Sequence, residues 1–210
     1  AAARNLLTYM RALSRRLLTA EELARVFGPQ SRLAPEFIYA LGKAFGNWAA
    51  SPRVRAFSDE WRRLFGIVYG EGFAAHGAEE AERLCRFYQV PSTADFPGLL
   101  FCVHTYFALL VKFLGWLALS RHLAVKLGAP SIGELLTADS DTLRRRLHEM
   151  ESGGIFRAYG IANLLEGDFF AWYLYAWSDD AEDAIRDILR RLDDYDTTAL
   201  TVVPEETRDL

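Results

Sequence analysis

The most continuous apolar stretch of the chain spans residues 97–127, and Gly128 and Pro130 follow it. A run of this length, ended by helix-stopping residues, predicts an α-helix rather than a strand. A helix that is apolar on nearly every side must be buried on every side, in a membrane or at the centre of a helical protein. Lys112 near its middle would cost about 2.5–3.5 kcal/mol inside a membrane. Because His104 adds to this cost, we expect the central helix of a soluble domain and no membrane association.

The rest of the chain reads as amphipathic helices that wrap around this central one, because apolar residues recur every three or four positions. Thr19 and Glu22 form a capping-box pattern that starts one of them. We expect Ser140 to cap another, and Asp179 or Asp180 to cap the last. The expected helices cover residues 4–18, 19–27, 35–50, 52–69, 79–88 and 142–150, two pieces within 155–177, and about 180–192.

These elements predict an all-α fold, a bundle of roughly eight helices around a long buried central helix. We expect one helical domain over residues 1–192, with a possible division into sub-lobes near residue 91. Residues 193–210 are polar and contain Pro204, so we interpret them as a linker.

Composition narrows the classes of function. The 210 residues include 51% hydrophobic and 13% aromatic side chains, which argues against disorder. The net charge of −4 argues against a generally basic nucleic-acid binder, although it allows a local basic strip. Cys85 and Cys102 lie in apolar surroundings and predict reduced core thiols of a cytoplasmic protein. The N-terminal segment has interleaved arginines without an apolar block, so we expect no signal peptide.

Four polar residues interrupt the two most apolar stretches: His104, Lys112, Glu166 and Asp168. Buried charges usually pair. We therefore expect Lys112 or His104 to meet Glu166 or Asp168 and to pin the segment 155–177 to the central helix. A structural pair is favoured over a catalytic acid–base set, because no nucleophile, metal cluster or phosphate-binding loop accompanies these residues.

Other chemistry-bearing motifs are lacking in the sequence. The four histidines are scattered and no Cys-x-x-Cys occurs, so we expect no metal site. No Walker loop, dinucleotide-binding glycine motif or nucleophile elbow is present. We therefore assign no catalytic residue.

Two basic strips could contact DNA phosphates. The first has four arginines on the helix 52–69, and the second has three in a row before His148. Such a strip is more often a solvated face paired with nearby acids, here Asp59, Glu60 and Glu149. The possible DNA-contact residues are Arg53, Arg55, Arg62, Arg63, Arg144, Arg145 and Arg146. The aromatic residues Trp172, Tyr173, Tyr175 and Trp177 could stack on bases, but their helical spacing favours packing.

Several long segments resemble one known family. They are residues 104–112 (HTYFALLVK), 159–173 (YGIANLLEGDFFAWY), and the ending with Tyr195-Asp196 and 203–210 (VPEETRDL). Residues 18–31 and 60–72 fit the same region. In this order they resemble the helical region that precedes the catalytic domain in large N6-adenine DNA methyltransferases of restriction-modification (type IIG-like) and phage-defence systems.

This resemblance implies a non-catalytic helical domain. In that family the Pro-Glu-x-x-Arg-x-Leu segment runs into the catalytic domain, which would follow Leu210. S-adenosylmethionine would then bind that following domain, and no cofactor is expected in this chain. The helical domain would position the catalytic domain and could contact double-stranded DNA. Two alternatives remain open: a self-contained protein–protein interaction module of a defence system, and an enzyme acting through His104 and Glu166.

Overall fold

The computed structural model describes residues 15–48, 51–69, 78–92, 95–127, 132–162 and 169–197, with side chains of the central helix described up to Arg121. The described part contains nine α-helices, one 3₁₀ helix and two short strands. In chain order they are β1 Arg16–Leu17, α2 Ala20–Phe27, α3 Leu33–Trp48, α4 Pro52–Tyr69, α5 Ala78–Tyr88, α6 Phe96–Leu127, α7 Ile132–Leu136, α8 Ser140–Glu151, α9 Gly154–Ala158, η2 Phe169–Tyr175, α10 Asp179–Asp193 and β2 Tyr195–Asp196. The predicted all-α class is confirmed.

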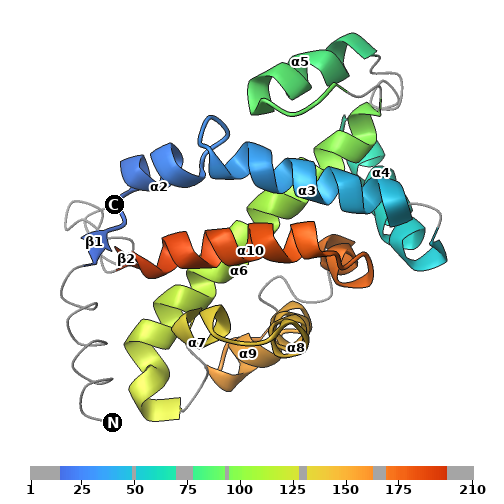
Figure 1. Ribbon diagram of the computed structural model, residues 1–210. Coiled ribbons are helices and arrows are strands. Elements are labelled where there is room, and N and C mark those ends of the chain that lie inside the picture. The colour runs from blue at the N-terminus through green and yellow to red at the C-terminus, as the bar shows by residue number, and fades with distance from the viewer. Residues whose placement is uncertain are drawn as a thin grey trace, which may run out of the picture.

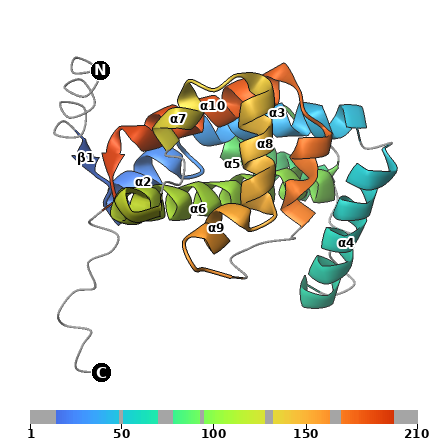
Figure 2. The same cartoon turned by 90° about the horizontal axis from the view of Figure 1, so that it is seen from below.

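Helix α6 is the long central helix that the apolar stretch predicts. Asp95 begins it, since its carboxylate accepts a hydrogen bond from the Gly98 backbone amide at 3.0 Å, as an N-cap side chain does. Helices α3 and α10 run beside each other and both pack on α6 (Figure 1). Helices α7, α8 and α9 lie on the other side of α10 from α3. Seen from below, α4 lies at one end of the molecule and β1 at the other (Figure 2).

Aromatic rings join these elements into one core. The ring of Phe101 on α6 lies 5.8 Å from Phe45 of α3, 5.2 Å from Trp61 of α4 and 5.6 Å from Trp172 of η2, between centroids. Offset and edge-to-face aromatic pairs of this kind add to the gain from burying apolar area. Because the cluster of buried residues runs from Leu18 to Tyr195, the possible division near residue 91 does not divide the core.

Helix α6 is also the one described helix that is long and apolar enough to cross a membrane. Residues 96–121 have a mean hydropathy of 1.7, but 61% of the window tested is buried against the rest of the chain. The core helix of a soluble protein has the same length and composition. The absence of membrane association therefore stays a prediction.

The two chain ends depart from the sequence-based expectation. Arg16 and Leu17, expected at the end of a helix, form strand β1, which pairs in parallel with β2. The backbone amide of Leu18 donates to the carbonyl of Asp196 at 2.8 Å. Tyr195 and Thr197, which belong to the segment expected to be a linker, are buried. Residues 4–14 and 198–210 lie outside the described residues.

The helix starts are close to those expected, with small corrections. Thr19 caps α2 through a bond from the Glu22 amide, as the capping box predicts. Helix α8 is capped by Asp139 instead of Ser140, and α10 by Ser178 instead of Asp179 or Asp180. Several Ser and Asp residues stand together at both places, and each has a suitable side chain, so the pattern alone does not select the cap.

Candidate functional site

The largest buried polar cluster joins three elements that lie far apart in the sequence. Lys112 of α6 and Glu151 of α8 form an ion pair with Nζ 2.5 Å from Oε2, and these side chains are 1% and 4% exposed. The hydroxyl of Tyr173 on η2 donates to the other Glu151 oxygen at 3.0 Å. A buried pair persists only when such additional hydrogen bonds satisfy it. The cluster therefore ties α8 and η2 to the central helix.

The acidic partner of Lys112 in this cluster is one that the sequence did not indicate. We expected Glu166 or Asp168, but the observed pair is formed with Glu151, at the end of a helix whose other residues are mostly polar. Glu166 and Asp168 lie outside the described residues, so their contact with Lys112 or His104 stays a prediction. The observed pair nevertheless achieves the expected result, because Tyr173 belongs to the segment that we expected to be pinned.

A second buried polar chain lies beside the first. The indole Nε1 of Trp172 donates to Thr105 Oγ1 at 2.8 Å, and the Thr105 hydroxyl donates to the Phe101 carbonyl at 2.8 Å. Trp172 and Tyr173 are fully buried, as the packing interpretation predicted. Their polar atoms are therefore used to hold the fold together.

His104 lies in an aromatic environment. Trp61 donates from its Nε1 to His104 Nδ1 at 3.3 Å, and the Phe65 ring centroid lies 4.6 Å from the imidazole centroid. Burial lowers the pKa of His104, so its neutral form is favoured. A neutral imidazole that accepts an indole proton is suited to a structural role.

The first predicted arginine strip, on α4, is largely engaged within the chain. Arg53 donates to the Tyr175 hydroxyl at 2.8 Å and lies over its ring. Arg62 lies 3.7 Å from Asp95, and Arg63 pairs with Glu60 at 2.6 Å. Arg55 forms no ion pair with any residue that the structure describes.

The second strip, on α8, is engaged in the same way. Arg144 donates to the Leu174 carbonyl at 2.6 Å, and Arg145 donates to the Thr142 hydroxyl at 3.0 Å. Arg146 pairs with Glu149 at 2.6 Å. Arg63 and Arg146 are thus paired with the nearby acids Glu60 and Glu149, while DNA contact by the two strips stays a prediction.

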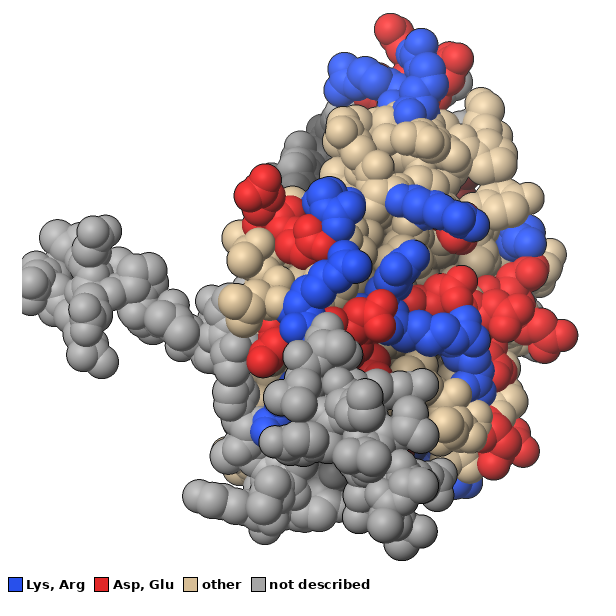
Figure 3. Space-filling model, turned by 60° about the vertical axis from the view of Figure 1, so that its left-hand side comes forward, with Lys and Arg blue, Asp and Glu red and all other residues tan. Residues whose placement is uncertain are grey.

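A further group of arginines lies in a groove of about 670 Å³ where β1, α2, the start of α3 and α10 meet. We call it the arginine groove. Figure 3 shows basic side chains gathered on this side of the molecule, with acidic ones between them. The groove is lined by the five arginines Arg16, Arg25, Arg32, Arg190 and Arg191, and by the three acids Glu36, Asp187 and Asp194.

Three of the five groove arginines have acidic partners and two do not. Salt bridges join Arg25 to Glu22, Arg32 to Glu36, and Arg190 to Asp187. Within the described part of the chain, the side chains of Arg16 and Arg191 form no ion pair, and both are exposed. A second groove of about 430 Å³ adjoins the first, shares Arg16, Arg190 and Arg191, and adds Arg15.

Sequence reasoning missed this groove because its members are about 170 residues apart along the chain. The adjacent pairs Arg15-Arg16 and Arg190-Arg191 are visible in the sequence, but nothing local brings them together. The parallel pairing of β1 with β2 does so, because β2 directly follows α10.

The described residues contain no group of three or more His, Cys, Asp or Glu that could hold a metal ion. The geometry therefore offers a structural core and one basic groove. Comparisons with protein-family models, with curated proteins and with solved structures found no match.

Proposed function

We propose that this chain is a non-catalytic helical domain of a DNA adenine methyltransferase of the restriction-modification or phage-defence kind. In this proposal the domain holds the catalytic domain, which follows Leu210, in position relative to DNA. S-adenosylmethionine binds that catalytic domain, and the transfer of its methyl group to adenine takes place there. The resemblance of several ordered segments to the helical region of that family suggests this role.

The observation that carries the proposal is the anchoring of the C-terminal strand. β1 pairs with β2, and the hydroxyl of Tyr195 donates to Glu22 of α2 at 2.8 Å. Residues 195–197 are thereby held against a core built around α6. This anchoring supports the proposal, because a strand fixed to the core is suited to holding a neighbouring domain in position.

The use of the buried polar groups gives further support. Lys112 and Tyr173 both donate to Glu151, and Trp172 donates to Thr105. Side chains committed to holding helices together are suited to a scaffold rather than to acid–base catalysis.

The proposal is tested in the native cell with an antibody raised against this chain. We expect a band far larger than the 23.7 kDa of these 210 residues. We also expect the immunoprecipitate to transfer labelled methyl groups from S-adenosylmethionine to adenine in duplex DNA. The same precipitation from cells that lack the gene is the control. An immunoprecipitate without adenine methylation would overturn the proposal, whatever the mass of the band.

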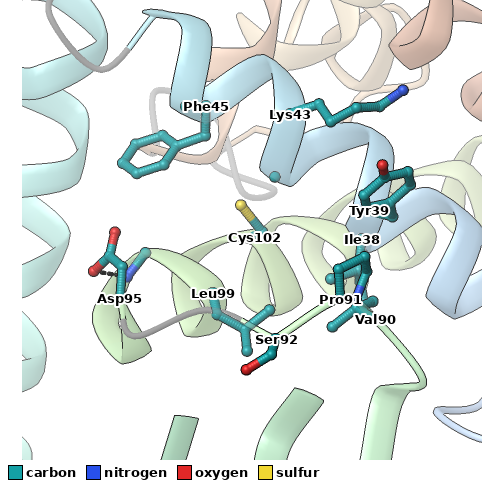
Figure 4. A pocket seen from close by; sticks show the side chains of 13 residues that line it. Ile38, Tyr39, Lys43, Phe45, Val90, Pro91, Ser92, Asp95, Leu99 and Cys102 are labelled. Atoms are coloured by element: carbon teal, nitrogen blue, oxygen red, sulfur yellow. Dashed lines mark hydrogen bonds between the residues drawn. The ribbon is translucent and has the colours of Figure 1, made fainter. Parts of the chain in front are cut away.

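A specific observation favours the second candidate, a protein–protein interaction module. An apolar pocket of about 300 Å³ lies between α3, the segment 90–92 and the start of α6. Figure 4 shows Cys102, Leu99 and Phe45 at this pocket, with Tyr39 and Lys43 on α3. Burial raises the pKa of the Cys102 thiol above its usual range, so the thiol stays protonated and acts as an apolar wall. An apolar side chain of a partner fits such a pocket.

Two glycines allow a matched test of this candidate. A Cβ at Gly46, which lines the pocket, or at Gly66 on α4 meets no heavy atom within 4 Å. If the chain is an interaction module, the side chain introduced by Gly46→Phe fills the pocket. We then expect this variant to lose a partner protein that co-elutes with the wild type from native extract. Gly66→Phe keeps that partner. Equal retention by both variants would remove the pocket from consideration.

A further inference from the structure

The arginine groove is lined by five arginines and three acids, in a chain whose net charge is −4. All of its basic lining residues are arginines. The guanidinium group is planar, stays charged and offers five N–H donors, which suits the paired oxygens of phosphate groups. The net negative charge of the protein repels anions in general. A local excess of arginine creates a positive potential that attracts an anion to this place.

The two unpaired arginines give the groove its binding capacity. Arg25, Arg32 and Arg190 already donate to carboxylates, while the exposed side chains of Arg16 and Arg191 form no ion pair in the described part of the chain. Glu36, Asp187 and Asp194 also face the groove, and two of these three acids are occupied by Arg32 and Arg190. An incoming phosphate therefore meets free guanidinium groups without first breaking an ion pair.

The shape of the surface favours a polymer over a single ion. The arginine groove continues into the adjoining groove through the shared residues Arg16, Arg190 and Arg191. The adjoining groove adds Arg15, which is paired with Asp193 at 3.1 Å. Arginines spread along such a track match phosphates that repeat along a backbone. Tyr195 lines both grooves, so the track also passes the anchored C-terminal strand.

We propose that the arginine groove, through Arg16 and Arg191, binds the phosphate backbone of double-stranded DNA, in place of the strips on α4 and α8. The choice of duplex DNA as the polymer rests on the proposed function. The phosphate contacts hold DNA beside strand β2, and they read no base sequence.

The test measures the binding of the purified 210-residue chain to a short labelled DNA duplex by fluorescence anisotropy across a range of salt concentrations. The double variant Arg16→Gln and Arg191→Gln removes two groove charges. We expect its affinity to fall about tenfold at low salt, and the slope of log affinity against log salt to decrease by about two. The variant Arg16→Lys and Arg191→Lys keeps the charges, so we expect it to retain the wild-type slope.

The matched control removes the same number of charges from the two strips. Arg55→Gln with Arg145→Gln changes one arginine on α4 and one on α8, and we expect no more than about a twofold change in affinity. An equal loss in the groove and strip variants would overturn the assignment, and so would a loss in the strip variant alone. Failure of the wild type to bind duplex DNA at low salt would overturn it as well, as would equal binding of a polyglutamate chain.

This experiment and the methylation experiment fail independently. A chain that binds DNA through the groove but precipitates without methyltransferase activity would overturn the proposed function only. A chain that precipitates with that activity but binds no duplex would overturn the groove assignment only.

Discussion

The buried cluster around Lys112 and the arginine groove both gather charged side chains from distant parts of the sequence, but they treat these charges differently. In the core, Lys112 and Glu151 are nearly inaccessible to water and bond to each other, with Tyr173 as a further partner. In the groove, Arg16 and Arg191 are exposed and have no acidic partner among the described residues.

The physical reason for the difference is the cost of desolvation. A charge that is removed from water must regain its lost hydration from fixed partners, or the fold becomes unstable. A charge at the surface keeps its hydration and needs no partner. The comparison teaches that Lys112 and Glu151 serve the structure, whereas two of the five groove arginines, Arg16 and Arg191, are exposed without an ion pair in the described part of the chain.

The largest effect on stability is expected for a substitution that breaks the buried ion pair. Lys112→Met leaves Glu151 buried without its cation, and we expect the free energy of unfolding to fall by about 3–5 kcal/mol. Urea denaturation measures it. The double variant Lys112→Met and Glu151→Leu removes both charges, and we expect it to recover most of the loss. Strictly additive effects of the two substitutions would contradict the coupling of these residues.

A smaller effect comes from the neighbouring neutral hydrogen bond. Trp172→Phe removes the donor to Thr105 Oγ1 and part of a buried ring, so we expect a loss of about 1–3 kcal/mol. Chemical denaturation again measures it. Trp177→Phe is the control, because its Nε1 bonds to Ser140 at 3.3 Å in an exposed site. If both variants lost equal stability, burial of the Thr105 contact would not explain the effect.

The next prediction concerns the pH dependence of stability at Glu22, the carboxylate paired with the groove residue Arg25. The hydrogen bonds from Arg25 and Tyr195 lower the pKa of Glu22 from 4.5 to about 2. Because the folded-state pKa lies below the unfolded value, Glu22 stabilises the fold above pH 4.5, and this contribution is lost as the pH falls towards 2.

We therefore expect Glu22→Gln to reduce the loss of melting temperature between pH 4.5 and 2, relative to the wild type. Thermal melting followed by circular dichroism checks this. Tyr195→Phe removes one of the two bonds and should give an intermediate profile. Identical acid profiles for Glu22→Gln and the wild type would show that Glu22 keeps its ordinary pKa in the folded protein.

The smallest effect is expected for the groove arginines themselves. Arg16→Gln with Arg191→Gln should change the free energy of unfolding by less than about 0.5 kcal/mol, because neither side chain has a partner to lose. Urea denaturation of the same protein that is used for DNA binding measures it. A loss as large as that of Trp172→Phe would mean that the fold depends on these arginines, and the comparison between core and groove would fail.

The sequence by itself determined the all-α class, the central helix and most of the helix positions. These features follow from local patterns: the unbroken apolar stretch over residues 97–127, the three-to-four-residue repeats, and caps such as Thr19 with Glu22. The burial of Trp172 and Tyr173 also followed from their spacing. Each of these inferences needs only neighbouring residues.

The tertiary structure decided which distant residues meet. It paired Lys112 with Glu151, which lies in a polar helix and gave no sign of burial. It formed β1 where a helix was expected. The local pattern did not indicate this strand, because its partner strand lies almost 180 residues away along the chain. The pairing of β1 with β2 also assembled the arginine groove. Hydrophobic periodicity records which face of a helix is buried, but it carries no information about the helix against which that face will pack.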